Sequence, residues 1–483
     1  MCQVLAVVKS TLCINFTVTS MRQYSPVTNE IKNVISERLG ADSVISSPEA
    51  LSEYSGDAST LSFTPELVVV AKSVSDIQVL MELANRYHFP VTPRGGGSGL
   101  AGACLPSNGG VVLSTVGLNR ITLIDSKNFI MKVEPGVISQ QVRDAAAAKG
   151  LFYPPDPAGM DLSTIGGNAA TDAGGPACVK YGTTRDYILG LEAVLPSGQL
   201  IRTGVQTRKG VVGYDLSNLI VGSEGTLGVI TSLTLKLLPK PAATTGIMCV
   251  FNDMVAAMNC VATIMGNGHL PSAIEFLDHK CLSLIGELLP FSLPGEKPSI
   301  LIIEIDGPKN QIKEEMEAIC SLVTDLGAIE LIRAESEKER SEIWAVRRQV
   351  SLRIHDYAGL YIPEDIVVPL TAIAELVDAL PYYEKKYGIE VFAFGHAGDG
   401  NIHLNITTQD TENVELAHEG TRALLELTLQ LQGTISGEHG IGIAKAEYLP
   451  MELTEESITL QKGIKKLFDP NMVLNPGKIF KNF

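Results

Sequence analysis

The segment PRGGGSGLAG occupies residues 93–102 and follows a short predicted strand at 89–92. It contains the spacing GxGxxG, which marks a dinucleotide-binding Rossmann fold only where it opens a helix. Here a turn-forming segment at 105–110 follows and leads into another predicted strand, which argues against a Rossmann fold. Consecutive glycines can still direct several backbone N–H groups at one anion. The segment is therefore a candidate pyrophosphate-binding loop, with a glycine-rich surface loop as the alternative.

Two further segments combine glycine with small or polar residues. Residues 154–175 contain PPDPA, then STIGGNAA, then AGG, and residues 222–230 read GSEGTLGVI. So little side-chain bulk allows two backbones to pack closely or a flat ligand to lie on the chain. Each segment alone is more typical of a structural turn than of a binding site.

Hydrophobic periodicity predicts helices and strands that are mixed along the whole chain, which indicates the α+β class. A continuous apolar run at 67–71 predicts a buried strand. Ser73 and Asp76 have the spacing of a capping box that opens a helix. The dipeptide at 197–198 predicts a hairpin turn.

Together and in this order, the three glycine-containing segments resemble the FAD-linked oxidoreductases that share the vanillyl-alcohol-oxidase type of flavin domain. The resemblance extends from about Leu51 to Phe483. Covalent members carry a histidine after the glycines, and Ser98 stands there in this chain, so the resemblance implies non-covalent FAD. The residues that it implies in cofactor binding are Arg94, Gly95, Gly96, Gly97, Ser98, Gly99, Pro155, Thr164, Gly166, Gly167, Asn168, Gly174, Glu224, Ile230 and Asn475.

The same resemblance implies how the chain is divided. We expect a disordered leader at 1–25 and a two-subdomain FAD-binding domain of the PCMH type at 26–240. An α+β substrate and metal domain is expected at 241–483, and its C-terminal helical segment is expected to return to the flavin. The prolines at 239 and 241 are consistent with a boundary at this point.

Two of the eight histidines lie in FGHAGDGNIHLN at 394–405, which predicts a strand, a tight turn and a second strand. His403 and Asn405 are two residues apart and share one face of the second strand. A glycine-flanked carboxylate follows in GEHG at 437–440. Two imidazoles and one carboxylate are typical of a catalytic divalent metal with an open position. The alternative is a pair of structural histidines that cap a hairpin.

These residues resemble the metal-dependent branch of the same family, which contains D-lactate, glycolate and D-2-hydroxyglutarate dehydrogenases. The resemblance implies that His396, His403 and Glu438 bind a divalent metal (zinc, manganese or iron). It also implies the substrate-binding residues, which are Arg347, Ser351, Asn405 and His439, with His439 and Arg347 in catalysis. In hydroxyglutarate enzymes a threonine and a later lysine assist, and Ser351 and the segment 363–365 replace them here.

The expected reaction is the FAD-dependent oxidation of glycolate or D-lactate to the 2-oxo acid. A metal would orient the substrate, His439 would accept the hydroxyl proton, and the hydride would pass to flavin N5. The alternatives are a D-2-hydroxyglutarate dehydrogenase, an FAD-containing electron-transfer subunit of a larger complex, and a metal-free oxidase that uses oxygen.

Composition limits the partners of the chain. Its 483 residues include 38 basic and 54 acidic side chains, for a net charge of −16, which argues against nucleic-acid binding. The eight cysteines form no CxxC pair, so we expect a reducing compartment and no iron–sulfur cluster in this chain. Electrons would pass to an iron–sulfur subunit or an electron-transfer flavoprotein.

No run of about 20 apolar residues predicts a membrane span. We expect a cytoplasmic protein, peripheral to the membrane only through a partner, and a homodimer is compatible with the sequence.

Overall fold

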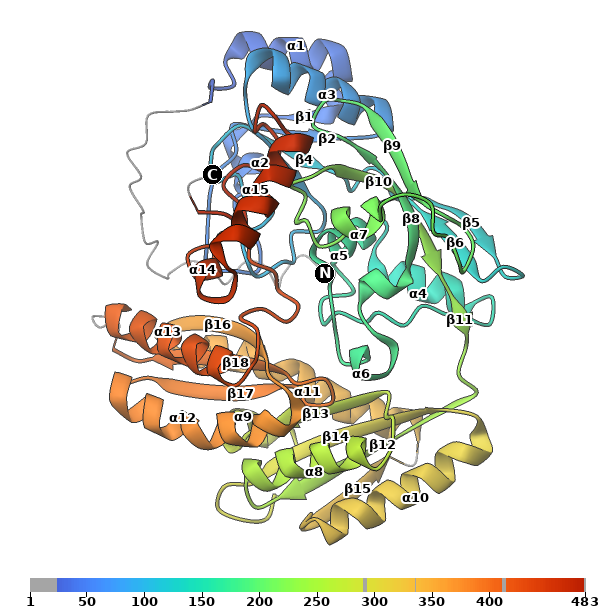
Figure 1. Cartoon of the computed structure of the whole chain (residues 1–483), viewed down its shortest axis with the longest axis vertical. Coiled ribbons are helices and arrows are strands. Elements are labelled where there is room, and N and C mark those ends of the chain that lie inside the picture. Colours follow the sequence, from blue (N-terminus) through green and yellow to red (C-terminus); the bar gives the residue numbers. More distant parts are fainter. Residues whose placement is uncertain (1–23, 290–292, 335, 411–413, 482–483) are drawn as a thin grey trace.

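The computed structural model describes residues 24–289, 293–334, 336–410 and 414–481. Most of the predicted leader at 1–25 lies outside these residues. Figure 1 shows an upper part, built from the first half of the chain and its C-terminal end, and a lower part built around one large sheet. In the described residues no helix is long and apolar enough to cross a membrane.

The upper part begins with a four-stranded sheet of order β1-β2-β4-β3. Its strands are β1 (Val44–Ile45), β2 (Leu67–Val70), β4 (Val111–Ser114) and β3 (Val91–Arg94). The helices α1 (Asn29–Leu39) and α3 (Val74–Tyr87) pack against it. The predicted capping box is confirmed: Ser73 and Asp76 exchange side-chain and backbone hydrogen bonds at the start of α3.

A second sheet in the upper part is antiparallel and has the order β5-β6-β10-β8-β9. Its strands are β5 (Ile121–Asp125), β6 (Ile130–Val133), β10 (Val229–Lys236), β8 (Ile188–Val194) and β9 (Leu200–Gly204). The strands β8 and β9 form the predicted hairpin. The smaller elements of this part are α2 (Pro48–Ser52), α4 (Ser139–Ala147), β7 (Leu151–Phe152), α5 (Ile165–Thr171), α6 (Cys178–Tyr181), α7 (Leu216–Ile220) and β11 (Leu238–Pro239).

The lower part is one antiparallel sheet of order β15-β12-β14-β13-β17-β18-β16. Its strands are β15 (Glu330–Ala334), β12 (Ala243–Phe251), β14 (Ser299–Gly307), β13 (Ala273–Leu277), β17 (Glu390–His396), β18 (Asn401–Thr408) and β16 (Leu360–Val367). One face packs on α8 (Met254–Gly266), α10 (Lys309–Asp325), α12 (Ile373–Tyr387) and α13 (Val414–Gln430). The other face carries α9 (His279–Ile285) and α11 (Glu337–Tyr357).

After α13 the chain returns to the upper part through α14 (Leu449–Glu452) and α15 (Glu455–Phe468). Leu474 then bridges to Val91 in parallel, beside the glycine-rich loop. The buried Lys465 holds this return, because its Nζ lies 2.5 Å from Asp469 and donates to the carbonyls of Thr226 (2.9 Å) and Leu474 (2.7 Å). The predicted fold class, including the returning C-terminal segment, is confirmed.

We expect Lys465→Met to lower the free energy of unfolding by about 3–5 kcal/mol, because Asp469 would keep a buried and uncompensated charge. Chemical denaturation of the two proteins measures this difference. In the exposed pair of Arg422 and Glu426, Arg422→Met should change the same quantity by about 0.5 kcal/mol or less. Equal small effects at both positions would contradict the role of the buried pair.

Candidate active site

Strand register brings the polar residues of the large sheet together on one face. His396 of β17 lies opposite Glu275 of β13, and His403 of β18 lies opposite Asp365 of β16. Side chains alternate between the two faces of a strand, and the neighbours of these residues fill the core under α8, α10, α12 and α13. The four residues therefore point to the opposite face, which also carries α11.

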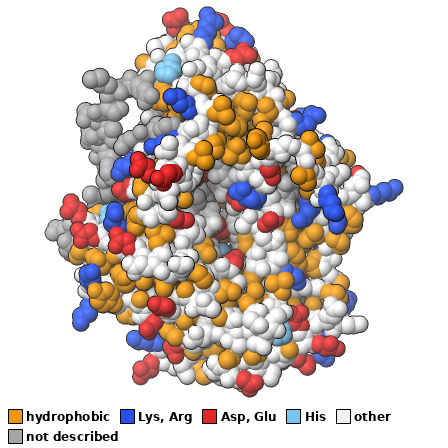
Figure 2. All heavy atoms as spheres, viewed as in Figure 1, with side chains coloured by type: hydrophobic (Ala, Val, Ile, Leu, Met, Phe, Trp, Pro, Cys, Tyr) orange, Lys and Arg blue, Asp and Glu red, His pale blue; other side chains and the backbone are white. Residues whose placement is uncertain are grey.

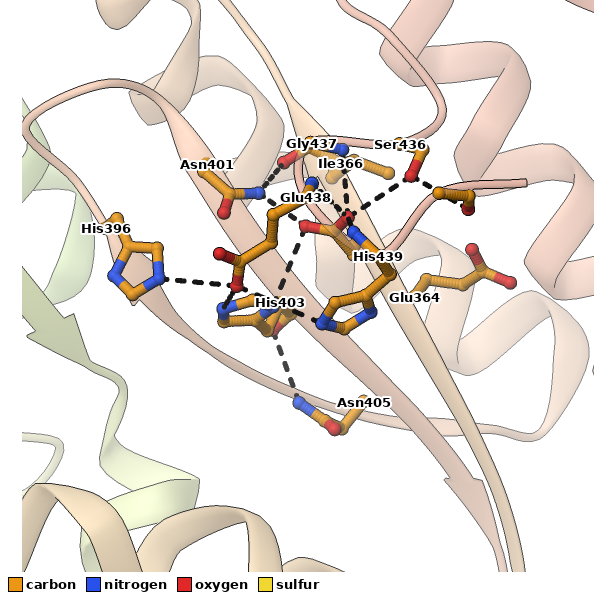
Figure 3. Close-up of polar contacts among 12 residues, drawn as sticks. Glu364, Ile366, His396, Asn401, His403, Asn405, Ser436, Gly437, Glu438 and His439 are labelled. Atoms are coloured by element: carbon orange, nitrogen blue, oxygen red, sulfur yellow. Dashed lines mark hydrogen bonds and ion pairs between the residues drawn. The ribbon is translucent and has the colours of Figure 1, made fainter. Parts of the chain in front are cut away.

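The loop after α13 adds Glu438 and His439 to this face (Figure 3). Glu438 Oε1 lies 3.6 Å from His396 Nε2, 3.6 Å from His403 Nε2 and 4.0 Å from His439 Nε2. The rings of His403 and His439 stack with centroids 5.3 Å apart. Burial lowers the pKa of His403 to about 3, so its imidazole is neutral and can offer a lone pair.

Glu275 is a functional residue that the sequence analysis missed. Its side chain is fully buried, and its Oε1 contacts His396 Nδ1. Its Oε2 accepts a hydrogen bond from Arg347 Nε at 2.7 Å. Burial alone would raise the pKa of Glu275, but His396 and Arg347 outweigh burial and lower it, so the carboxylate is ionised.

Asp365 is the second missed residue, and it fixes the loop that carries Glu438. Asp365 Oδ2 accepts hydrogen bonds from the backbone N–H groups of Gly437 (2.9 Å), Glu438 (2.8 Å) and His439 (2.9 Å). Asp365 Oδ1 accepts one from Asn401 Nδ2 at 2.6 Å. With these contacts in place, Asp365 is better suited to hold the loop than to bind a metal, although one of its oxygens lies close to His403, Glu438 and His439.

A carboxylate from the upper part holds the other end of the same loop. Glu224 accepts hydrogen bonds from the backbone N–H groups of Ile441 (2.8 Å) and Gly442 (2.7 Å). Asn475 Nδ2 donates to the carbonyls of Glu224 (2.7 Å) and Ala103 (3.0 Å). The loop is therefore anchored to both parts of the molecule.

A pocket in the upper part reaches this cluster. It is lined by the glycine-rich loop, by the small-residue segments and by two residues of the cluster, and its lining includes Arg94, Gly95, Gly96, Gly97, Ser98, Gly99, Thr164, Gly166, Gly167, Asn168, Glu224, Ile230, Glu438 and His439. Most residues predicted to bind the cofactor thus surround one cavity, and Glu438 and His439 connect that cavity to the cluster.

Arg94 gives this pocket a buried positive charge. The residue is 8% exposed, and within the described residues it forms no ion pair with a carboxylate. Its guanidinium donates to Cys104 Sγ at 3.5 Å and would collide with a side chain at Gly97, whose φ is +68°. Its charge is also felt by the carboxyl of Asp57, which lines the same pocket, and its guanidinium lies 5.7 Å from the Tyr54 ring centroid. A buried arginine below a glycine-rich loop, with no direct carboxylate pair, suits an anionic ligand such as a pyrophosphate.

Four predicted residues lie elsewhere. Pro155 accepts a hydrogen bond from Arg143 through its carbonyl and does not line the pocket. Gly174 packs against Glu438, since a Cβ there would lie 2.8 Å from Oε2. Ser351 is exposed on α11. Asn475 is buried beside the pocket, and its Oδ1 has no partner in the protein.

Substituting Asp365→Asn should loosen residues 437–439, because a neutral amide oxygen is a weaker acceptor than the carboxylate that now receives three N–H groups. We expect hydrogen exchange at these three amides to become at least tenfold faster. The exposed Asp356 provides a control, and Asp356→Asn should leave the three amides unchanged. Unchanged exchange in Asp365→Asn would contradict the anchoring role.

Comparison with known proteins identifies the family. Residues 65–204 match the family described as "FAD binding domain", and residues 240–479 match "FAD linked oxidases, C-terminal domain". The chain is 37% identical over 457 residues to "Glycolate oxidase subunit GlcD" of Bacillus subtilis (strain 168), covering 94% of this chain and 97% of that protein. It is 35% identical over 472 residues to "D-lactate dehydrogenase" of Anaerostipes hadrus, covering 95% and 98%.

Solved structures show the same fold at low sequence identity. p-Cresol methylhydroxylase with substrate bound has a TM-score of 0.77 at 17% identity, over 94% of this chain and 97% of that chain. An alkyldihydroxyacetonephosphate synthase has a TM-score of 0.73 at 19% identity, over 92% and 85%. The fold, the pocket and the two full-length relatives together show that this chain belongs to the FAD-linked oxidases and is an FAD-dependent oxidoreductase.

Proposed function

We propose that the protein is a metal- and FAD-dependent dehydrogenase that oxidises a short D-2-hydroxy acid, glycolate or D-lactate, to the 2-oxo acid. The observation that carries this proposal is that Glu438, which lines the pocket, lies 3.6 Å from both His396 and His403. Relatives that align over nearly the whole chain are named glycolate oxidase subunit and D-lactate dehydrogenase, which supports the same substrate class.

The chemistry of the donor set fits a divalent metal. Tetrahedral ligands at about 2.1 Å from a metal lie about 3.4 Å apart, and the Nε2 atoms of His396 and His403 each lie 3.6 Å from Glu438 Oε1. Donor atoms of His403, Glu438, His439 and Asp365 also lie within 4.8 Å of one another, so His439 is a further candidate ligand. The Nδ1 atom of His396 contacts Glu275, and that of His403 lies 3.8 Å from Asp365, so each Nε2 is directed inward. Nitrogen and carboxylate ligands suit zinc, manganese or iron. Such a metal would polarise the substrate hydroxyl.

The pocket residues fit FAD bound without a covalent link, because Ser98 stands where covalent members carry histidine. Arg94 and the backbone of residues 95–99 would hold the pyrophosphate, and the small residues at 164–168 and 224–230 would line the rest of the cofactor. Asn475 Oδ1 offers a buried acceptor that the protein leaves free. When bound, the flavin would supply the hydride acceptor.

Three side chains of this site would act on the substrate. Arg347 would bind the carboxylate, since its guanidinium is 4.5 Å above the Phe394 ring and adjoins the cluster. Asn405, whose Oδ1 accepts from Tyr361 at 2.7 Å, would orient the substrate through its amide. His439 would accept the hydroxyl proton at a ring nitrogen, because it lies beside Glu438 and lines the FAD pocket.

The segment that replaces the lysine of hydroxyglutarate enzymes favours a monocarboxylate. Glu364 lies there and pairs at 3.0 Å with the buried Lys445, which also donates to two backbone carbonyls. Lys445 is therefore fully engaged in contacts within the protein and is not available to bind a second carboxylate of a substrate. D-2-hydroxyglutarate remains the alternative substrate, and Ser351 on α11 remains a proposed contact.

The electrons would leave through a protein partner, either an iron–sulfur subunit or an electron-transfer flavoprotein. The relative from Bacillus subtilis is named as a subunit, which supports a partner. On the face shown in Figure 2, acidic and basic side chains are interspersed and no continuous basic surface is seen, which supports the expected absence of nucleic-acid partners; a cytoplasmic location stays a further prediction. Attachment to a membrane would then occur through the partner, and a homodimer stays a further prediction.

We expect FAD-loaded protein to reduce an artificial dye with glycolate or D-lactate, and metal removal by a chelator to abolish this activity. Addition of MnCl₂ or ZnCl₂ should restore it. His439→Ala should lower kcat by about 100-fold or more, because the proton acceptor is lost. Dye reduction under saturating substrate measures each of these effects.

The alternatives give different results in the same assay. Activity that survives complete metal removal would contradict the metal role, and release of hydrogen peroxide at the dye-linked rate would indicate an oxidase. Unchanged activity in His439→Ala would favour a flavin relay or a different base.

Substitution Arg94→Met should weaken FAD binding by about 10- to 100-fold, because a charge-assisted hydrogen bond contributes about 1.5–3 kcal/mol. Titration of the apoprotein with FAD, followed by flavin fluorescence, measures the dissociation constant. Arg120, whose side chain is 76% exposed, is the control, and Arg120→Met should leave the constant unchanged. A similar dissociation constant for the wild type, Arg94→Met and Arg120→Met would show that the pyrophosphate does not bind at Arg94.

A further inference from the structure

We infer that Glu275 is a positioning residue that joins the metal-binding histidine to the substrate-binding arginine, so that one carboxylate sets the geometry of both. The inference rests on the proposed function and adds a residue that neither the sequence motifs nor the comparisons assign. It depends on three observations: the two contacts of Glu275, the position of the Arg347 guanidinium and the polar attachment of the first half of α11 to the sheet.

The two oxygens of Glu275 serve different partners. Oε1 contacts His396 Nδ1, which directs the opposite ring nitrogen, Nε2, toward Glu438. Oε2 accepts the Nε–H of Arg347 at 2.7 Å. Glu275 is 0% exposed, so water does not replace either contact. A carboxylate can accept both bonds at once, whereas an amide has only one oxygen.

The contact with Glu275 also determines which nitrogens of the Arg347 guanidinium are available to a substrate. Its bond occupies Nε, and the Phe394 ring lies against the plane of the guanidinium at 4.5 Å from its central carbon. Among the described residues, the two terminal nitrogens donate to no protein acceptor, since the printed hydrogen bond of Arg347 uses Nε. They form an end-on fork that matches a carboxylate, and the substrate carboxylate is expected to bind there.

The helix that carries Arg347 is positioned by polar contacts as well as by apolar packing. Of the 21 residues of α11, Val350 and Ile354 are buried, and Ile343 and Val346 are partly buried against the same core. Its first half is attached to the sheet through Glu304, which accepts from Arg340 (2.6 Å) and Trp344 (2.9 Å), and then through Glu275. Glu304 and Glu275 lie on the same face of the sheet, but Glu304 has no contact with a histidine of the cluster.

This difference makes Glu304 a matched control. We expect Glu275→Gln to weaken binding of Mn²⁺ by about 10- to 100-fold, the usual effect of losing the carboxylate behind a ligating histidine. Isothermal titration of metal-free, FAD-loaded protein with MnCl₂ measures this without any turnover. Glu304→Gln should bind Mn²⁺ with the wild-type constant.

The effect of the substitution on Arg347 is measured by steady-state kinetics at saturating Mn²⁺. In Glu275→Gln, KM for D-lactate and for glycolate should rise at least fivefold more than kcat falls, since a misplaced Arg347 weakens carboxylate binding. Glu275→Asp keeps the charge but is too short to reach both partners, so it should show the same two losses if the glutamine variant is insoluble. Flavin content and circular dichroism confirm the fold of each variant.

The outcomes separate this inference from the proposed function. If the wild-type protein binds no Mn²⁺ and oxidises neither hydroxy acid, the proposed function fails and the inference with it. If the wild type does both while Glu275→Gln retains its Mn²⁺ constant and its KM values, only the inference is overturned. If neither Glu275→Gln nor Glu275→Asp affects one of the two ends, the inference is also overturned, because the link requires Glu275 to hold both partners.

Discussion

The site depends on one buried carboxylate that accepts three consecutive backbone N–H groups. Asp365 receives the amides of Gly437, Glu438 and His439, and so determines where the loop places its two functional side chains. Burial would raise the pKa of Asp365, but His439, Lys445, His403 and the loop amides outweigh it and hold the pKa far below its usual value. An anion held in this way is costly to displace, which makes the loop a rigid part of the active site.

The same loop joins the two parts of the molecule. Glu224 from the upper part accepts the amides of Ile441 and Gly442, only a few residues beyond the contacts of Asp365. Lys180 and Tyr181 of α6 add a second connection through Asp306 of β14, at 2.6 and 2.7 Å. The loop of residues 437–442 is therefore bonded to both parts, and these contacts fix the end of the pocket relative to the histidine cluster.

Much of this arrangement could be predicted from the sequence because it has local signals. The capping box at Ser73, the hairpin at 197–198 and the histidine motif at 394–405 each lie within a few residues. Glu275 and Asp365 have no such signal, since their partners lie 121 and about 72–74 residues away. The one available signal was a glutamate inside the apolar strand AIEFL, because a charge in a buried strand requires a partner. The predicted contacts of Pro155 and Ser351 came from the resemblance alone, and strand register and helix rotation decide such contacts.

The strands and the helix that carry the site are attached to the rest of the protein by different kinds of contact. His396, His403 and Asp365 lie on strands whose alternate residues fill a continuous apolar core, so their backbone positions are determined by packing. Arg347 lies instead on a helix that packs on the sheet through fewer buried residues, and two carboxylates of the sheet add polar contacts to it. A metal at the proposed site would need fixed ligand distances, which the packed strands supply. Arg347 would keep its Nε contact with Glu275 while its terminal nitrogens bind the substrate carboxylate, so a polar attachment fixes one edge of the guanidinium and leaves the other edge available to an anion.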